Sequence, residues 1–280
     1  MKCIKHELKK RYFSLGFLIP CKLGLVLSIL HCINISVIYI NTYREILQME
    51  NVDGIFLSNP HFPIYTVFNL WIGNSHDSFY AKCFFGIMPV LATFPFIWSF
   101  CHDIKHKNRI HLKRHQYIMH YCSCFLASGT IAAFPLAINF LGALLFVPAT
   151  KPDSIYDIYY GIFSYDFLSL LFYNAPFLYV IIFILMNFML YGMIGCLGLS
   201  ISQATKKTAI PLILPVISLY IIELINRFIF QYIRVEFSPI SYLFPANSHK
   251  TKLQIVIIEL VVLVILTFII PVYKEVENEK

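Results

Sequence analysis

The stretch "FGIMPVLATFPFIWSFCHDIKHKNRIHLKRH", from Phe85 to His115, changes character halfway along its length. Up to Trp98 it is apolar and holds two prolines, whereas from His102 onward Lys, Arg and His dominate. An abrupt change from apolar to basic residues is typical of a helix that leaves a membrane on its inner side. A metal site and a nucleic-acid surface are the two alternatives for the basic half, and the remainder of the chain decides among the three.

The overall composition favours the membrane. The chain has 280 residues, of which 58% are hydrophobic and 13% charged, and its mean hydropathy is +0.70. Soluble domains have about 25% charged residues, and one of this length has too little interior to bury so much apolar surface. Because open-ended segments cross a bilayer only as helices, we expect an all-α, polytopic membrane protein with a single transmembrane domain over residues 1–280.

A helix needs about 20 predominantly apolar residues to cross the hydrocarbon layer. Stretches that qualify as spans lie at about 15–40, 82–101, 117–147, 168–201, 209–233 and 253–273. The third and fourth are longer than one crossing requires, so we expect them to tilt or to extend beyond the bilayer. The sequence therefore predicts six transmembrane helices.

The distribution of Lys and Arg predicts how these helices are oriented. One side carries most of them: Lys2, Lys5, Lys9, Lys10, Arg11, Lys105, Lys107, Arg109, Lys113, Arg114, Lys206, Lys207, Lys274 and Lys280. The opposite side holds fewer, in loops at about 41–81, 148–167 and 234–252. We therefore expect both termini in the cytoplasm and the chain in the cell membrane. Residues 1–14 are expected to form a basic helix in the inner interface, with Ile4, Leu8 and Tyr12 on one face; a charged flank that sets topology is a compatible interpretation.

The basic half of the opening stretch contains two histidine pairs at i, i+4 spacing, His102–His106 and His111–His115, beside Asp103. This spacing suits zinc if the segment is helical, but the interspersed cations oppose a bound metal, so no metal site is predicted. The positive-inside rule accounts for the charge without a nucleic acid. The sequence predicts a loop at the membrane edge that contacts an intracellular partner.

Glu223 and Arg227 lie four residues apart within the fifth apolar stretch, where unpaired charges are costly. The spacing allows them to pair with each other, and Glu259 in the sixth stretch is a rival partner for Arg227. The favoured interpretation is a self-neutralising pair that fixes helix packing; lining a substrate path is the alternative. In the fourth stretch, Gly192, Cys196 and Ser200 form a stripe of small residues suited to helix–helix contact.

A hydrolytic function is a weaker alternative. The segment "ELINR", Glu223 to Arg227, resembles the first motif of intramembrane CAAX-type proteases. That family uses a pair of Glu residues, whereas Ile222 precedes Glu223 here, and His31 and His120 have no evident catalytic partner. We therefore expect no catalytic residues, and the absence of a Walker A sequence excludes ATP binding in the P-loop manner.

Several segments together resemble the permease subunits of ATP-binding-cassette transporters of the type-2, exporter-like class, which are common in Gram-positive bacteria. The segments are "KHELKKRYFSLGFLIPCKLGLVLSILHCI" (Lys5–Ile33), "GIMPVLATFPFIWSFCHDIKHKNRIHLKRHQYIMHY" (Gly86–Tyr121), "YGMIGCLGLSISQATKKTAIPLILPVISLYI" (Tyr191–Ile221) and "FSPISYLFP" (Phe237–Pro245). In the second segment the matching positions are Pro89, Pro95, Asp103, Arg109, Arg114 and Tyr117.

The resemblance implies a partner-dependent mechanism. Two six-helix permease chains, identical or paralogous, would pair around a central path, and a separate ATPase dimer would dock on the cytoplasmic face. ATP would then be bound only by the partner, and the chain would hold no cofactor of its own. Residues expected to couple to the ATPase are Asp103, Lys105, Lys107, Arg109, Lys113 and Arg114. The expected cargo is a peptide, a lipid-linked molecule or an amphipathic drug-like molecule, and immunity to an antimicrobial peptide is a plausible role. A non-transporting membrane scaffold or immunity protein is the alternative from another class.

Overall fold

The computed structural model describes most of the chain. Backbone is described for residues 12, 14–53, 65–75, 78–105, 114–205, 209–233, 235–245 and 251–278. Side chains are described for residues 12, 14–45, 48, 65–75, 78–95, 120–155, 157, 160–202, 205, 210–229, 232, 235–245 and 251–267.

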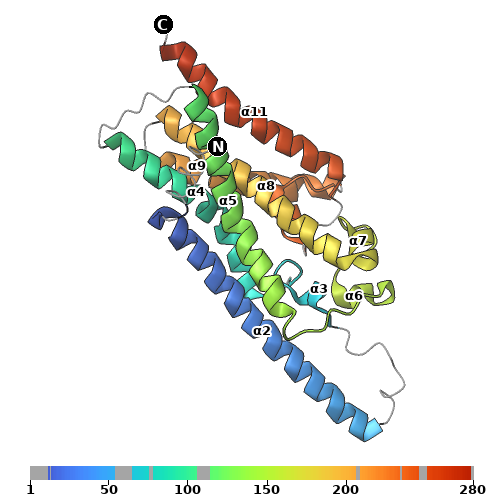
Figure 1. The fold of residues 1–280 in the computed structure, drawn as a ribbon. Helices are drawn as coiled ribbons and strands as arrows, with labels where there is room; N and C mark the ends of the chain where they lie inside the picture. Colours follow the sequence, from blue (N-terminus) through green and yellow to red (C-terminus); the bar gives the residue numbers. More distant parts are fainter. Residues whose placement is uncertain are drawn as a thin grey trace.

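Within these residues the fold is all-helical, as the composition predicts (Figure 1). The long helices are α2 (Leu15–Asp53), α4 (Phe79–Lys105), α5 (Arg114–Ala143), α8 (Pro176–Thr205), α9 (Ala209–Ile233) and α11 (Leu253–Asn278). The short ones are α3 (Val67–Leu70), η2 (Ser154–Tyr156), α6 (Asp157–Tyr160), α7 (Ser169–Asn174) and α10 (Pro239–Leu243). Each of the predicted apolar stretches overlaps one long helix.

Four helices have the length and hydropathy needed to cross a membrane within the described residues. They are Leu15–Glu45, His120–Ala143, Pro176–Ser202 and Ile210–Ile229. Large apolar side chains on the outer faces of the bundle are exposed, among them Val37, Leu224 and Val261. Apolar exposure of this extent is expected where helices face lipid rather than water, so these features indicate a membrane protein.

Three predicted spans have wrong boundaries. Helix α2 does not end at residue 40 but continues to Asp53, so part of the expected outer loop is helical. The fourth stretch is not one long helix from residue 168: Leu168 adopts a left-handed conformation with φ 60°, α7 follows, and α8 begins only at Pro176. The break precedes a proline because proline disfavours a helical conformation in the residue before it.

The third stretch also ends early, because α5 stops at Ala143 and residues 144–147 form turns. The prolines within helices are tolerated: α4 continues through Pro89 and Pro95, and α5 through Pro135. Since a lost backbone hydrogen bond is re-satisfied more readily where neighbouring helices pack closely, none of these positions interrupts its helix.

Helices α5 and α8 form the centre of the bundle and approach each other closely (Figure 1). A Cβ atom on Gly129 of α5 would lie 2.6 Å from the carbonyl oxygen of Phe188, and one on Gly192 of α8 would lie 2.8 Å from the ring of Phe125. Only glycine permits such backbone approach. The predicted small-residue stripe is confirmed as a packing face, because its other two members are buried on this side of α8.

The stripe also carries hydrogen bonds between helices. Cys196 Sγ donates to the carbonyl oxygen of Tyr121 at 3.4 Å, and the hydroxyl oxygens of Ser200 and Tyr121 lie 2.8 Å apart. The Ser200 hydroxyl is also 2.8 Å from the carbonyl oxygen of Thr267 in α11. A single residue of α8 thus bonds to both α5 and α11.

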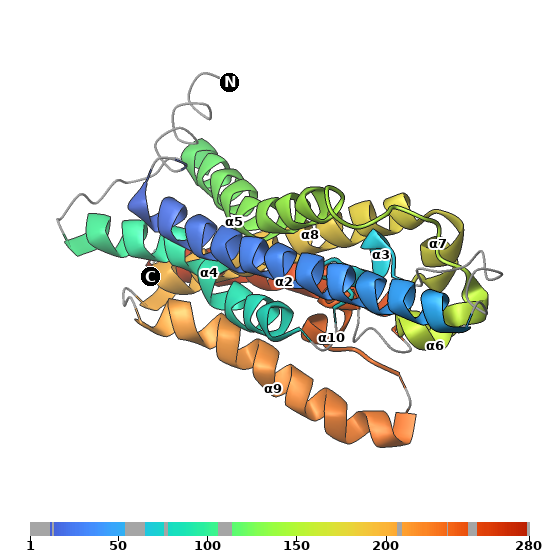
Figure 2. The same ribbon diagram turned by 90° about the horizontal axis from the view of Figure 1, so that it is seen from below.

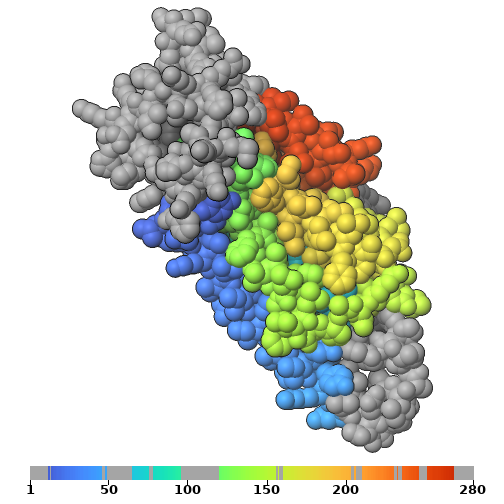
Figure 3. Space-filling view, in the orientation of Figure 1, coloured from blue at the N-terminus to red at the C-terminus, as the bar shows by residue number. Residues whose placement is uncertain are grey.

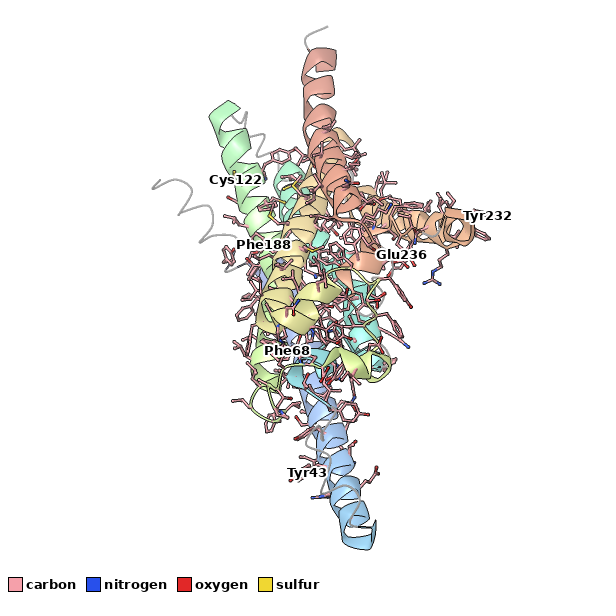
Figure 4. All side chains as sticks on the ribbon, turned by 90° about the vertical axis from the view of Figure 1, so that its right-hand side faces the viewer. Tyr43, Phe68, Cys122, Phe188, Tyr232 and Glu236 are labelled. Atoms are coloured by element: carbon pink, nitrogen blue, oxygen red, sulfur yellow. The ribbon has the colours of Figure 1, made fainter. Side chains whose placement is uncertain are left out.

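Helix α9 lies at the edge of the bundle and diverges from it towards its C-terminal end (Figures 2 and 4). Its Tyr220 hydroxyl donates to the carbonyl oxygen of Gly86 in α4 at 2.7 Å. Further along, Tyr232 points outward, away from the other helices (Figure 4). Most of the α9 surface is therefore covered by no other part of the described chain.

The short helices α3, α6 and α7 lie at the end of the bundle opposite the C-terminal ends of α4, α8 and α11 (Figure 1). Here the Tyr173 hydroxyl of α7 donates to the carbonyl oxygen of Ile162, and the carboxylate of Asp166 accepts from the backbone N–H of Phe163 at 2.6 Å. Burial raises the pKa of Tyr173 above its ordinary value, so its hydroxyl keeps its proton over the physiological range. These bonds close a compact cap at this end.

Candidate functional site

A buried polar cluster lies between α2, α5 and the segment that follows α3. Its centre is the Asn139 amide, which has no exposed surface. Asn139 Nδ2 donates to the carbonyl oxygen of Ser28 at 2.9 Å and lies 3.1 Å from His31 Nδ1, while its Oδ1 accepts from the backbone N–H of Ile72 at 2.9 Å. Cys32 Sγ donates to the carbonyl oxygen of Asn139 at 3.2 Å. We call these five residues the Asn139 cluster.

The Asn139 cluster fixes the segment around α3 inside the bundle. Residues 66–74 are all buried, with Trp71 and Phe68 packed edge-on against Phe140 and Phe177 respectively. Asn74 Nδ2 donates to the carbonyl oxygen of Phe68 at 2.7 Å. A buried loop must satisfy its backbone groups, and Asn139 supplies the acceptor for one of them. The sequence predicts an outer loop for this segment, but the structure places it in the core.

A second polar site surrounds α10, which is held by side chains from three long helices. Ser241 Oγ of α10 donates to Glu223 Oε2 at 2.9 Å, and the next residue, Tyr242, donates its hydroxyl proton to Glu259 Oε2. The carbonyl oxygen of Leu243 accepts from Asn187 Nδ2 at 3.1 Å.

Asn226 completes this set, because its Oδ1 accepts from the backbone N–H of Phe237 at 3.0 Å, just before α10. The α10 anchor residues are therefore Asn187, Glu223, Asn226 and Glu259. Together they bond residues 237–243 to α8, α9 and α11. Stacking of Phe244 on Phe85, with ring centroids 4.6 Å apart, adds a contact to α4.

Arg227 bonds to Glu223 rather than to Glu259. Its Nε lies 2.8 Å from Glu223 Oε1, one helical turn away. Glu223 is mostly enclosed, with 14% of its side chain exposed, whereas the Arg227 side chain is 75% exposed. Both oxygens of the Glu223 carboxylate are thus engaged, one by Arg227 and one by Ser241. This arrangement suits a packing role and leaves Glu259 with no ion-pair partner among the described side chains.

An apolar groove of about 160 Å³ lies between α8 and α11, beside the α10 anchor residues. Its walls are formed by Ile182, Leu185, Met186, Met189, Leu190, Val256 and Leu260. Two of these wall residues, Met186 and Leu260, are the chain neighbours of the anchors Asn187 and Glu259. The groove and the charged anchor therefore adjoin on α11.

The side chains of the predicted ATPase-coupling residues lie outside the part of the chain that the structure describes. Asp103 and Lys105 lie in the last turns of α4, and Arg114 begins α5, but their side chains are outside the described set. Lys107, Arg109 and Lys113 lie outside the described residues altogether, as do residues 1–11 of the predicted basic helix. Tyr12 is described, and its hydroxyl oxygen lies 3.0 Å from that of Thr130 in α5.

Among the side chains that the structure describes, no group of three His, Cys, Asp or Glu residues is placed to hold a metal ion. The histidine pairs of the basic segment lie outside that set. Sequence reasoning considered His31 only as a catalytic residue and missed its partner Asn139. The available signal was the occurrence of isolated Asn residues, Asn139, Asn187 and Asn226, in otherwise apolar helices.

Comparison of the chain with family models, with curated proteins and with solved structures found no match. The resemblance to exporter-type permeases therefore rests on the sequence motifs and remains a prediction.

Proposed function

We propose that the chain is the membrane-spanning permease subunit of an ATP-driven exporter. In this proposal all six long helices span the cell membrane of a bacterium, both termini lie in the cytoplasm, and a second permease chain completes the substrate path. A separate ATPase dimer binds and hydrolyses ATP. The cargo is a peptide, a lipid-linked molecule or another amphipathic molecule.

The observation that carries the proposal is the position of the basic segment. It connects α4 directly to α5, and α5 packs along its length against α8 at the centre of the bundle. A push on the α4–α5 connection would be transmitted to the bundle core, because α4 leads into this segment and α5 leads out of it. Electrostatic attraction between basic and acidic surfaces speeds and orients docking more than it adds affinity, which suits a partner with an acidic face.

The proposal is tested by co-purification of the tagged full-length chain with an ATPase subunit from the native membrane. Wild type should retain the ATPase. Exchange of Lys105, Lys107, Arg109, Lys113 and Arg114 for Gln should abolish that association. A control with Lys151 and Lys252 exchanged for Gln, on the proposed outer side, should retain it. An ATPase that stays bound to the first variant would contradict the docking role of this segment, and wild type without any ATPase would favour the scaffold alternative.

A further inference from the structure

Among the described side chains, Glu259 is the carboxylate of the α10 site that has no ion-pair partner. Arg227 is occupied by Glu223, and α8 and α10, which face this part of α11, contain no Asp, Glu, Lys, Arg or His. The preceding cation in the chain, Lys252, comes just before α11, seven residues or about 10 Å from Glu259 along the axis, and its side chain is exposed. The Tyr242 hydroxyl bonds to Oε2. A carboxylate in an apolar setting is costly without a positive partner, so the site favours a cation.

The adjoining groove supplies the complementary apolar part. Its wall is almost entirely carbon and sulfur surface, with two methionines, Met186 and Met189, whose flexible side chains adapt to varied shapes. At 3.6 residues per turn, Glu259 lies about 60° around α11 from the wall residue Val256. The face on which α8 and α11 lie side by side is seen in Figure 3.

We propose that this groove and Glu259 form a binding site for a cationic amphiphile. The alkyl chain lies between α8 and α11, and the ammonium group bonds to the Glu259 carboxylate. The negative charge selects this occupant over an anionic phospholipid, whose phosphate would be repelled. The site as such is independent of transport, but its identification as the place where cargo is recognised rests on the proposed function.

Binding is measured with the full-length chain in nanodiscs of neutral phosphatidylcholine. The probes are dodecylamine, dodecanol and dodecyl sulfate, each with a dansyl group at the far end of the alkyl chain. The headgroups stay free, so the probes share one chain and differ in charge. Because close charge pairs contribute at least about 1.5 kcal/mol, we expect the amine to bind about tenfold more tightly than the sulfate.

Two variants separate the charge from the groove. Glu259→Gln should lower the affinity for the amine about tenfold and leave that for the dodecanol unchanged, whereas Glu259→Asp should keep the preference for the amine. Met189→Trp, which fills the groove, should weaken all three probes. Ile217→Trp, on the exposed face of α9, serves as the control and should change nothing.

The proposal fails if wild type binds the three probes equally, or if Glu259→Gln leaves the preference for the amine intact. Should Glu259→Gln not fold, unchanged binding in Met189→Trp overturns the proposal equally well. The outcome is distinct from that of the ATPase experiment. A selective site without an ATPase partner would refute transport alone, and an ATPase partner without selectivity would refute this site alone.

Discussion

Asn139 joins three segments that are far apart in the sequence. Its Oδ1 is taken by the Ile72 N–H and its Nδ2 faces Ser28 and His31, so the orientation of the amide is determined. Since Nδ2 is a donor, His31 Nδ1 is the acceptor, and the ring proton lies on Nε2. One amide therefore sets both the position of the buried segment around α3 and the tautomer of a buried histidine.

Replacing Asn139 by Ala should lower the free energy of unfolding by about 2–4 kcal/mol, because the N–H of Ile72 and the carbonyl of Ser28 lose a buried partner. The measurement is the thermal or denaturant midpoint of the purified chain in detergent. Asn41→Ala is the matched control: Asn41 lies on α2, the helix that faces Asn139 through Ser28 and His31, but its side chain is exposed. Equal stability of the two variants would show that Asn139 is dispensable.

At the scale of the element, the close approach of α5 and α8 depends on glycines. Gly129→Ala would place a methyl group 2.6 Å from the backbone oxygen of Phe188, so the helices must separate. We expect a loss of about 1–3 kcal/mol of stability, seen as a lower unfolding midpoint. Gly86→Ala is the control, because its Cβ would meet only the Tyr220 hydroxyl at 3.7 Å. If Gly129→Ala is as stable as Gly86→Ala, the interface is more adaptable than the contacts indicate.

The long helices could be predicted from the sequence because apolar runs of this length have few alternative structures. Pro176 is the sequence signal for the break before α8. The apolar run continues on both sides of this proline, so its length alone predicts one uninterrupted helix. The burial of residues 66–74 and the hydrogen bonds that hold α10 against α8, α9 and α11 could not be predicted from the sequence. Both depend on single polar side chains, Asn139 and the α10 anchor residues, that lie in other helices and become neighbours only in the folded bundle.

For the whole molecule, the proposed orientation predicts a pattern of chemical labelling. A cysteine at position 151, between α5 and α8, should react with a membrane-impermeant maleimide in intact cells. A cysteine at position 107, between α4 and α5, should react only after the membrane is permeabilised, because the two positions lie on opposite sides. The unsubstituted chain measures the background from its own cysteines. Reaction of both positions in intact cells would contradict the orientation.

The contrast between the two carboxylates of the α10 site bears on how the chain is made. Glu223 and Arg227 belong to one helix, so their charges neutralise each other as soon as α9 forms, before any later segment has left the ribosome. Glu259 has no such partner in its own helix; its hydrogen-bond donor, Tyr242, is synthesised 17 residues earlier. In the proposed six-span arrangement, α9 can therefore enter the lipid by itself, whereas α11 would enter at lowest cost with α10 already folded beside it. Residues 237–278 would then be inserted as one cooperative unit.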